Sequence, residues 1–191
     1  RSEGPHSHMA AQFLFNRKED LVVSDFYMTV SSLIPWLAPE SRYYGLSDDE
    51  IYVQLFTQYL RPRPAILALV DDFHLKHMKG RNWVAVHMRG SDKIYESAGL
   101  HQTNSRYFDF VDRIVELNPG IGIFLLTDSV SIHTEFSARY ADRLVTTTAL
   151  RSASNTGVHM QGHSGRTVGE EVLVDVLLAS RCDYFIGNQE S

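Results

Sequence analysis

The chain has 191 residues, of which 43% are hydrophobic and 21% charged, and its formal net charge is −5 at pH 7. These values are typical of a folded globular domain and argue against a disordered or collagen-like chain. The negative charge argues against a nucleic-acid binder, because phosphate neutralisation needs clustered Lys and Arg. The one cysteine, Cys182, excludes an internal disulfide framework and a zinc site built from cysteines.

The N-terminal part of the chain predicts helices. Residues 1–9 are polar and end in His-Met, as an expression-tag remnant does, so we exclude them from the fold. Ser47 stands three residues before Glu50, and this capping box predicts a helix that continues to about Tyr59. The prolines over 62–64 end that helix, and a second one is expected over 65–78.

After residue 80 the apolar pattern changes to that of strands alternating with helices. Strands are expected over 83–88, 121–126, 143–148 and 183–187. Helices are expected over 105–118, 130–140 and 167–180, with a capping box from Thr167 to Glu170 in the last of them and a polar loop over 151–165 before it. This alternation predicts an α/β fold with a Rossmann-like parallel sheet and helices on both faces. We therefore expect a mainly helical region over 10–80 and a sheet domain over 81–191.

Polar side chains follow the predicted strands at the edge where a parallel sheet binds ligands. His87, Arg89, Gly90, Asp92 and Lys93 come after the first strand, and Asp128 after the second. An arginine offers a planar fork of donors that stays charged, a lysine adds a second cation, and a glycine lets a ligand approach the backbone. Such groups suit a diphosphate that gains negative charge as it departs.

Three missing motifs narrow the chemistry. The chain has no GxxxxGK[ST] motif, which argues against a P-loop nucleotidase, and no GxGxxG motif, which argues against a dinucleotide cofactor. No two aspartates stand two residues apart, whereas enzymes that hold a diphosphate through a metal use closely spaced carboxylates. His159 and His163 stand four residues apart, but in a glycine-rich loop without an evident third ligand. We therefore expect no metal and no other cofactor.

The segment Val86–Lys93 reads Val-His-Met-Arg-Gly-Ser-Asp-Lys and resembles the HxRRxDK motif of the α-1,6-fucosyltransferases and nodulation fucosyltransferases. Further matches follow in the family's order, and the resemblance covers roughly residues 53–191. They are an Arg-Pro-x-Pro turn at residues 61–64, Thr127-Asp128 at a strand end, a final helix and strand over 173–187 that contain Asp175, and Ser191.

The resemblance implies the nucleotide-sugar-binding half of a GT-B glycosyltransferase. The implied reaction is an inverting, metal-independent transfer of fucose from GDP-fucose to a hydroxyl of a glycan or other acceptor. Residues 10–80 would then contribute part of the acceptor side. By position, the resemblance places Arg89 at the diphosphate, His87 beside the nucleotide, Asp128 and Asp175 in the nucleotide site, and Ser191 in the phosphate-binding turn. The family's second arginine is Gly90 in this chain.

Several of these residues have structural alternatives. Arg89 could pair with Asp92, and Asp92 could either orient Arg89 or deprotonate the acceptor. Glu96 is a second candidate for the base, and Lys93 either contacts phosphate or is a solvated surface charge. Three further alternatives are a packed imidazole for His87, a helix N-cap for Asp128, and a structural pair with Arg166 or Arg181 for Asp175.

Three other functions stay open on the sequence. The same scaffold could use another nucleotide sugar, or the chain could be an inactive homologue that still binds the nucleotide. A flavodoxin-like regulatory domain is the third. No apolar run reaches the roughly 18 residues of a membrane-spanning helix, so no transmembrane segment is expected. The single cysteine slightly favours a bacterial cytoplasm over the Golgi lumen.

Overall fold

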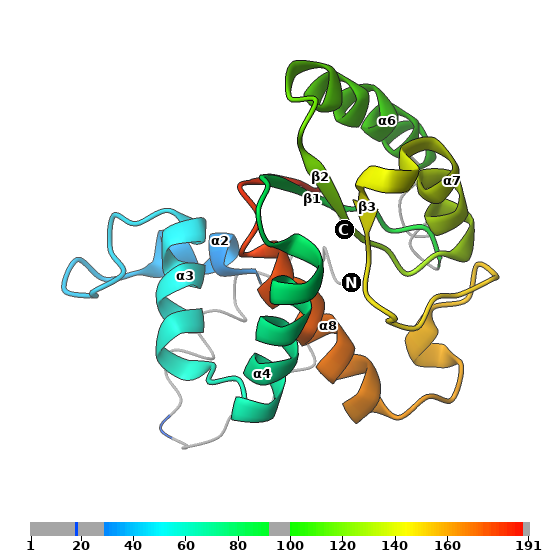
Figure 1. The fold of residues 1–191 in the computed structure, drawn as a ribbon. Helices are drawn as coiled ribbons and strands as arrows, with labels where there is room; N and C mark the ends of the chain where they lie inside the picture. The colour runs from blue at the N-terminus through cyan, green and yellow to red at the C-terminus, as the bar shows by residue number, and fades with distance from the viewer. Residues whose placement is uncertain (1–17, 19–28, 92–99, 189–191) are drawn as a thin grey trace. The chain divides into compact units, whose positions relative to one another are not determined.

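The computed structural model describes residue 18, residues 29–91 and residues 100–188. The chain divides into two compact units, Arg1–Arg61 and Pro62–Ser191 (Figure 1). Within the described ranges, no helix has both the length and the apolar character to cross a membrane.

The first unit contains α2 (Val30–Leu33), the 3₁₀ turn η1 (Ile34–Trp36) and α3 (Asp48–Tyr59). The capping box predicted at the start of α3 is confirmed. The Ser47 hydroxyl accepts from the Glu50 amide at 3.3 Å, and the Glu50 carboxylate accepts from the Ser47 amide at 2.8 Å. Two unsatisfied donors of the first turn are thereby paired, which fixes where α3 begins.

The second unit is built on a parallel sheet (Figure 1). Its strands are β1 (Trp83–His87), β2 (Gly122–Leu126), β3 (Leu144–Val145) and β4 (Tyr184–Ile186), in the order β3-β2-β1-β4. Val84 lies opposite Ile123 of β2 on one side and Tyr184 of β4 on the other. The central strand β1 is therefore flanked on both sides, and the predicted α/β fold with a parallel sheet is confirmed.

Helices cover both faces of this sheet, because successive strand residues point to opposite sides. Val84 and Val86 pack in one core with α6 (Leu100–Leu117) and α7 (Val130–Tyr140). The alternating residues of β1 pack in a second core with α4 (Pro64–Phe73), the π-helical turn η2 (His74–Met78) and α8 (Gly165–Ala179). Burial on both faces therefore explains why nearly every residue of the central strands is apolar.

The placement of α4 makes the second unit start earlier than the domain boundary expected after residue 80. Val70 of α4 is fully buried in the core that also holds Trp83 and Phe124. Removing α4 would expose this side of the sheet to water, so α4 belongs to the same compact unit as the sheet.

Two elements differ from their predicted starts. The capping box predicted from Thr167 to Glu170 is wrong, because α8 begins at Gly165 with Ser164 as its N-cap. The Glu170 carboxylate instead accepts from Arg166 at 2.9 Å and lies 3.3 Å from Arg63. The helix predicted over 105–118 begins earlier, at the start of α6.

The third strand is shorter than predicted, because the residues after Val145 bind side chains instead of continuing the sheet. Thr147 donates its hydroxyl hydrogen bond to Asp175, and its carbonyl accepts from Arg151. The polar loop expected after this strand contains the short 3₁₀ turn η4 (Val158–Met160).

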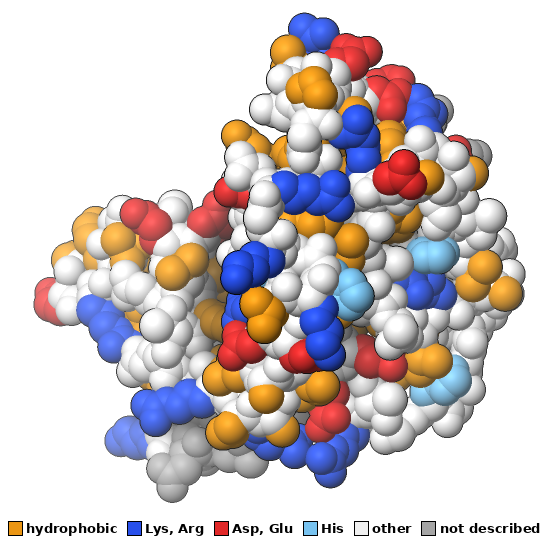
Figure 2. Space-filling view, viewed as in Figure 1, with side chains coloured by type: hydrophobic (Ala, Val, Ile, Leu, Met, Phe, Trp, Pro, Cys, Tyr) orange, Lys and Arg blue, Asp and Glu red, His pale blue; other side chains and the backbone are white. Residues whose placement is uncertain are grey.

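Acidic and basic side chains are interspersed over the face of the second unit that Figure 2 shows. The exposed ion pairs of this unit include Lys76 of η2 with Asp72 of α4, and Arg113 with Glu116 on α6. Such pairs contribute little to stability, so the second unit depends on its two apolar cores.

Gly122 faces the buried indole of Trp83 across the β1–β2 pair. A Cβ at this glycine would lie 2.5 Å from two indole carbons, and Trp83 is only 2% exposed. Gly122→Ala is expected to destabilise the chain by about 2 kcal/mol, because the overpacked core must shift. Gly120→Ala is the matched control, since a Cβ there meets nothing within 4 Å. Thermal unfolding of both variants checks this, and equal melting temperatures would contradict it.

Candidate functional site

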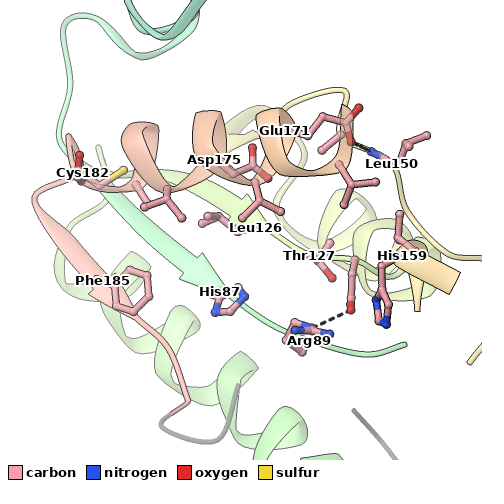
Figure 3. Close-up of a pocket in the computed structure, with 18 of the residues that line it drawn as sticks. His87, Arg89, Leu126, Thr127, Leu150, His159, Glu171, Asp175, Cys182 and Phe185 are labelled. Atoms are coloured by element: carbon pink, nitrogen blue, oxygen red, sulfur yellow. Dashed lines mark hydrogen bonds and ion pairs between the residues drawn. The ribbon is translucent and has the colours of Figure 1, made fainter. Parts of the chain in front are cut away.

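A cavity of about 760 Å³ lies along α8 in the second unit. One end is formed by the carboxyl ends of β1 and β2, and the other by the start of β4 (Figure 3). The loop after β3 and the turn η4 complete its wall. The helices that follow β1 and precede β4 lie on opposite faces of the sheet, and such a switch point is where doubly wound sheets bind ligands.

Asp128 holds the loop after β1 at one end of this cavity. Its carboxylate accepts from Arg89 Nε at 2.8 Å, from the Gly90 amide at 2.9 Å and from Ser91 Oγ at 2.6 Å. The alternative reading of Asp128 as an N-cap is wrong, because Ser129 caps α7. The alternative pair of Arg89 with Asp92 concerns a residue outside the described ranges, and the ion pair that is described joins Arg89 to Asp128.

The backbone of Asp128 holds a second loop. Its carbonyl accepts from the Ser152 amide at 2.7 Å, and the Ser152 carbonyl accepts from the Val130 amide at 2.9 Å. Ser152 belongs to the loop after β3 and accepts from Gln161 Nε2 at 2.7 Å. One aspartate therefore fixes the loops after β1 and β3 against the end of β2.

Gly90 is packed tightly against the first turn of α7. A Cβ at Gly90 would lie 2.4 Å from Ile132 Cδ1 and 3.0 Å from Ser129 Cβ. A side chain at this position, such as the arginine of the fucosyltransferase motif, would therefore require the side chains of Ile132 and Ser129 to shift. The loop after β1 presents the Arg89 guanidinium, which is partly exposed, and the backbone approaches α7 at Gly90.

His87 lies at the end of β1 and lines the cavity (Figure 3). Burial lowers the pKa of its imidazole, and the positive charge of Arg89 lowers it further, against a smaller opposite effect of Asp128. The imidazole is therefore uncharged at neutral pH and can offer one donor and one acceptor.

Asp175 lines the cavity from the middle of α8 (Figure 3). Thr147 Oγ1 donates to its carboxylate at 2.7 Å. Burial raises the pKa of Asp175 to about 6, while the Thr147 hydrogen bond and the Arg151 charge oppose this shift. The structural partners considered for Asp175 are occupied elsewhere, since Arg166 pairs with Glu170 and Arg181 with Asp71.

Two residues of the site, one that lines the cavity and one that supports its wall, could not be identified from the sequence motifs. Glu171 lies one helical turn before Asp175, and its carboxylate accepts from the Leu150 amide at 3.0 Å. Arg151 braces the loop after β3, donating to the carbonyls of Thr147 at 2.9 Å and Ala149 at 3.1 Å. The spacing of Glu171 and Asp175 could have shown that they share a helix face. Arg151 gives no local signal, because its partners depend on where the loop leaves β3.

Four of the predicted site residues lie outside the described residues. These are Asp92, Lys93, Glu96 and Ser191. Their assignments, including both candidates for the base, stay predictions. Within the ranges that the structure describes, no group of three or more His, Cys, Asp or Glu side chains is placed to hold a metal ion.

No protein-family model matches the chain, and neither does any curated protein. Among solved structures, NodZ α-1,6-fucosyltransferase co-crystallised with GDP is similar, with 23% identity and a TM-score of 0.44 over 64% of this chain and 36% of that chain. The selenomethionine form of fucosyltransferase NodZ from Bradyrhizobium gives 20% identity and a TM-score of 0.48 over 71% of this chain and 41% of that chain. NodZ soaked with GDP-fucose gives the same values.

The chain spans less than half the length of these structures. It is similar in fold to part of the NodZ fucosyltransferase, the family that the sequence motifs resemble.

Proposed function

We propose that this chain binds a nucleoside diphosphate sugar in the cavity along α8 and takes part in an inverting, metal-independent glycosyl transfer. The favoured donor is GDP-fucose, and the acceptor is a hydroxyl of a glycan or another molecule. The cavity volume of about 760 Å³ suits such a ligand, since pockets that bind small molecules measure about 300–1,000 Å³.

The observation that carries the proposal is the Arg89–Asp128 pair at the cavity end formed by β1 and β2. Asp128 fixes the guanidinium through Nε at 2.8 Å, and the side chain stays 28% exposed at the cavity wall. A fixed guanidinium binds phosphate oxygens with directed, charge-assisted hydrogen bonds. In the proposed reaction Arg89 stabilises the negative charge that the departing diphosphate gains.

Asp175 suits the base of the nucleotide. It is partly buried on α8 and lines the same cavity as Arg89. Its carboxylate is ionised above pH 6 and could accept from two neighbouring N–H groups, as guanine presents at N1 and N2. A carboxylate away from water needs hydrogen-bond donors. This supports a guanine nucleotide over a nucleotide whose base has fewer adjacent N–H donors.

The base that deprotonates the acceptor is proposed to be Asp92 or Glu96. Both come shortly after Arg89 in the chain, so either could reach a sugar attached to the bound diphosphate. Lys93 and Ser191 are proposed to contact the phosphates, as the sequence resemblance implies.

Titration calorimetry of the 191-residue chain with GDP, GDP-fucose, GDP-mannose and UDP, with EDTA throughout, tests the proposal. Binding of GDP and GDP-fucose that survives EDTA is the expected result. Binding of UDP without GDP would overturn the guanine assignment and leave another nucleotide sugar as the donor. Absence of all binding would overturn the proposed function.

Hydrolysis of GDP-fucose without an acceptor separates an enzyme from a binding module. Slow release of free fucose is expected, because water can replace the acceptor hydroxyl. Nucleotide binding without any hydrolysis or transfer would identify an inactive homologue that keeps the nucleotide site.

A further inference from the structure

Among the described residues that line the cavity, Arg89 is the one arginine, and no described lysine lies beside it. The Arg89 guanidinium is already paired with the Asp128 carboxylate at 2.8 Å. Burial and the Arg89 charge lower the pKa of His87, so this histidine adds no charge at neutral pH. The residue after Arg89, Gly90, stands where the fucosyltransferase motif has its second arginine.

His159 is the remaining side chain able to carry positive charge among the described residues that line the cavity. It lies in η4, on the wall formed by the loop after β3, and it is exposed. Figure 3 shows His159 and Arg89 at the same end of the cavity, away from Cys182. A phosphate group at this end would meet both side chains.

The backbone turn that carries His159 is held by neighbouring residues. Val158 is buried beside it, and Gln161 Nε2 donates to Ser152 Oγ at 2.7 Å on the other side of the turn. Ser152 is in turn hydrogen-bonded to the backbone of Asp128 at 2.7 Å. The turn that carries His159 is thus tied to the residue that orients Arg89.

We infer that His159 is a second phosphate ligand of the cavity, beside Arg89, in a chain that lacks the second arginine of the fucosyltransferase motif. The inference rests on the proposed function, because it concerns the diphosphate of the same ligand. An imidazole N–H can donate a hydrogen bond to a phosphate oxygen, as the N–H groups of the Arg89 guanidinium can.

The test measures GDP and GMP binding by calorimetry in His159→Gln, His159→Arg and the control His163→Gln. His163 lies in the same polar loop, is exposed, and does not line the cavity. His159→Gln is expected to weaken GDP binding about tenfold, because a hydrogen bond to a phosphate oxygen is lost. The affinity for GMP, which has one phosphate fewer, should fall less, and His159→Arg should retain the affinity for GDP.

Unchanged GDP affinity in His159→Gln, with normal wild-type binding, would overturn the inference and leave the proposed function standing. An equal loss in His163→Gln would also overturn it, because the effect would then belong to the loop. Absence of GDP binding in the wild-type chain would overturn both the proposed function and the inference.

Discussion

Replacing Arg89 with alanine is expected to weaken GDP binding about 100-fold, because it removes charge-assisted hydrogen bonds to the diphosphate. The fold should change little, since Arg89 is a partly exposed side chain at the end of β1. Arg89→Lys keeps the charge but loses the planar fork, so we expect an intermediate affinity. Calorimetry at one fixed salt concentration compares the three proteins.

Arg113→Ala is the matched control for this variant. Arg113 is exposed on α6, pairs with Glu116 and does not line the cavity. Asp128→Asn should lower both GDP affinity and thermal stability, because three hydrogen bonds then lose a charged acceptor. The variant that combines Arg89→Ala with Asp128→Asn should lose less binding free energy than the sum of the losses in the two single variants, since both substitutions act on one guanidinium. Wild-type GDP affinity in Arg89→Ala would contradict the phosphate role.

Asp175→Asn is expected to stabilise the folded chain at about pH 8 by roughly 2–3 kcal/mol while abolishing GDP binding. Burial raises the pKa of Asp175 to about 6 in the folded state, above its ordinary value. The folded state therefore binds the proton more tightly than the unfolded state does. This makes the contribution of Asp175 to stability most favourable below the unfolded pKa, and the contribution declines as pH rises through about 6.

Asparagine carries no charge at any of these pH values and can still accept the Thr147 hydrogen bond. The gain in stability should therefore be large at about pH 8 and nearly absent at about pH 4. Urea unfolding across this range checks the prediction, with Asp72→Asn, an exposed carboxylate of α4, as the control. A loss of stability in Asp175→Asn at high pH would contradict the prediction that the ionised Asp175 carboxylate destabilises the folded state there.

The sheet and its order of helices could be predicted because they follow from local apolar patterns. The run from Trp83 to His87 and the run from Gly122 to Leu126 are apolar on both faces, as strands between two helical layers must be. The cavity end at the carboxyl side of β1 also follows from this topology, which is why the sequence predicts Arg89 and His87 at this edge of the sheet.

The supports of the site could not be predicted, because they depend on contacts between distant segments. Thr147 and Asp175 are 28 residues apart, and Arg89 and Asp128 are 39 apart. Asp128 stands next to Ser129, and either residue type caps helices well, so propensity alone does not separate the cap from the arginine partner. The early start of α8 depends on how the loop after β3 reaches the sheet, for which the sequence has no local pattern.

Asp128 has a consequence for the thermodynamics of ligand entry. Its carboxylate holds the loop after β1 and its carbonyl holds the loop after β3, so both walls at this end are joined before any ligand arrives. A ligand that meets aligned donors loses little affinity to the ordering of side chains and loops. The association should therefore behave as rigid docking, with a small heat-capacity change beyond that of the buried apolar surface.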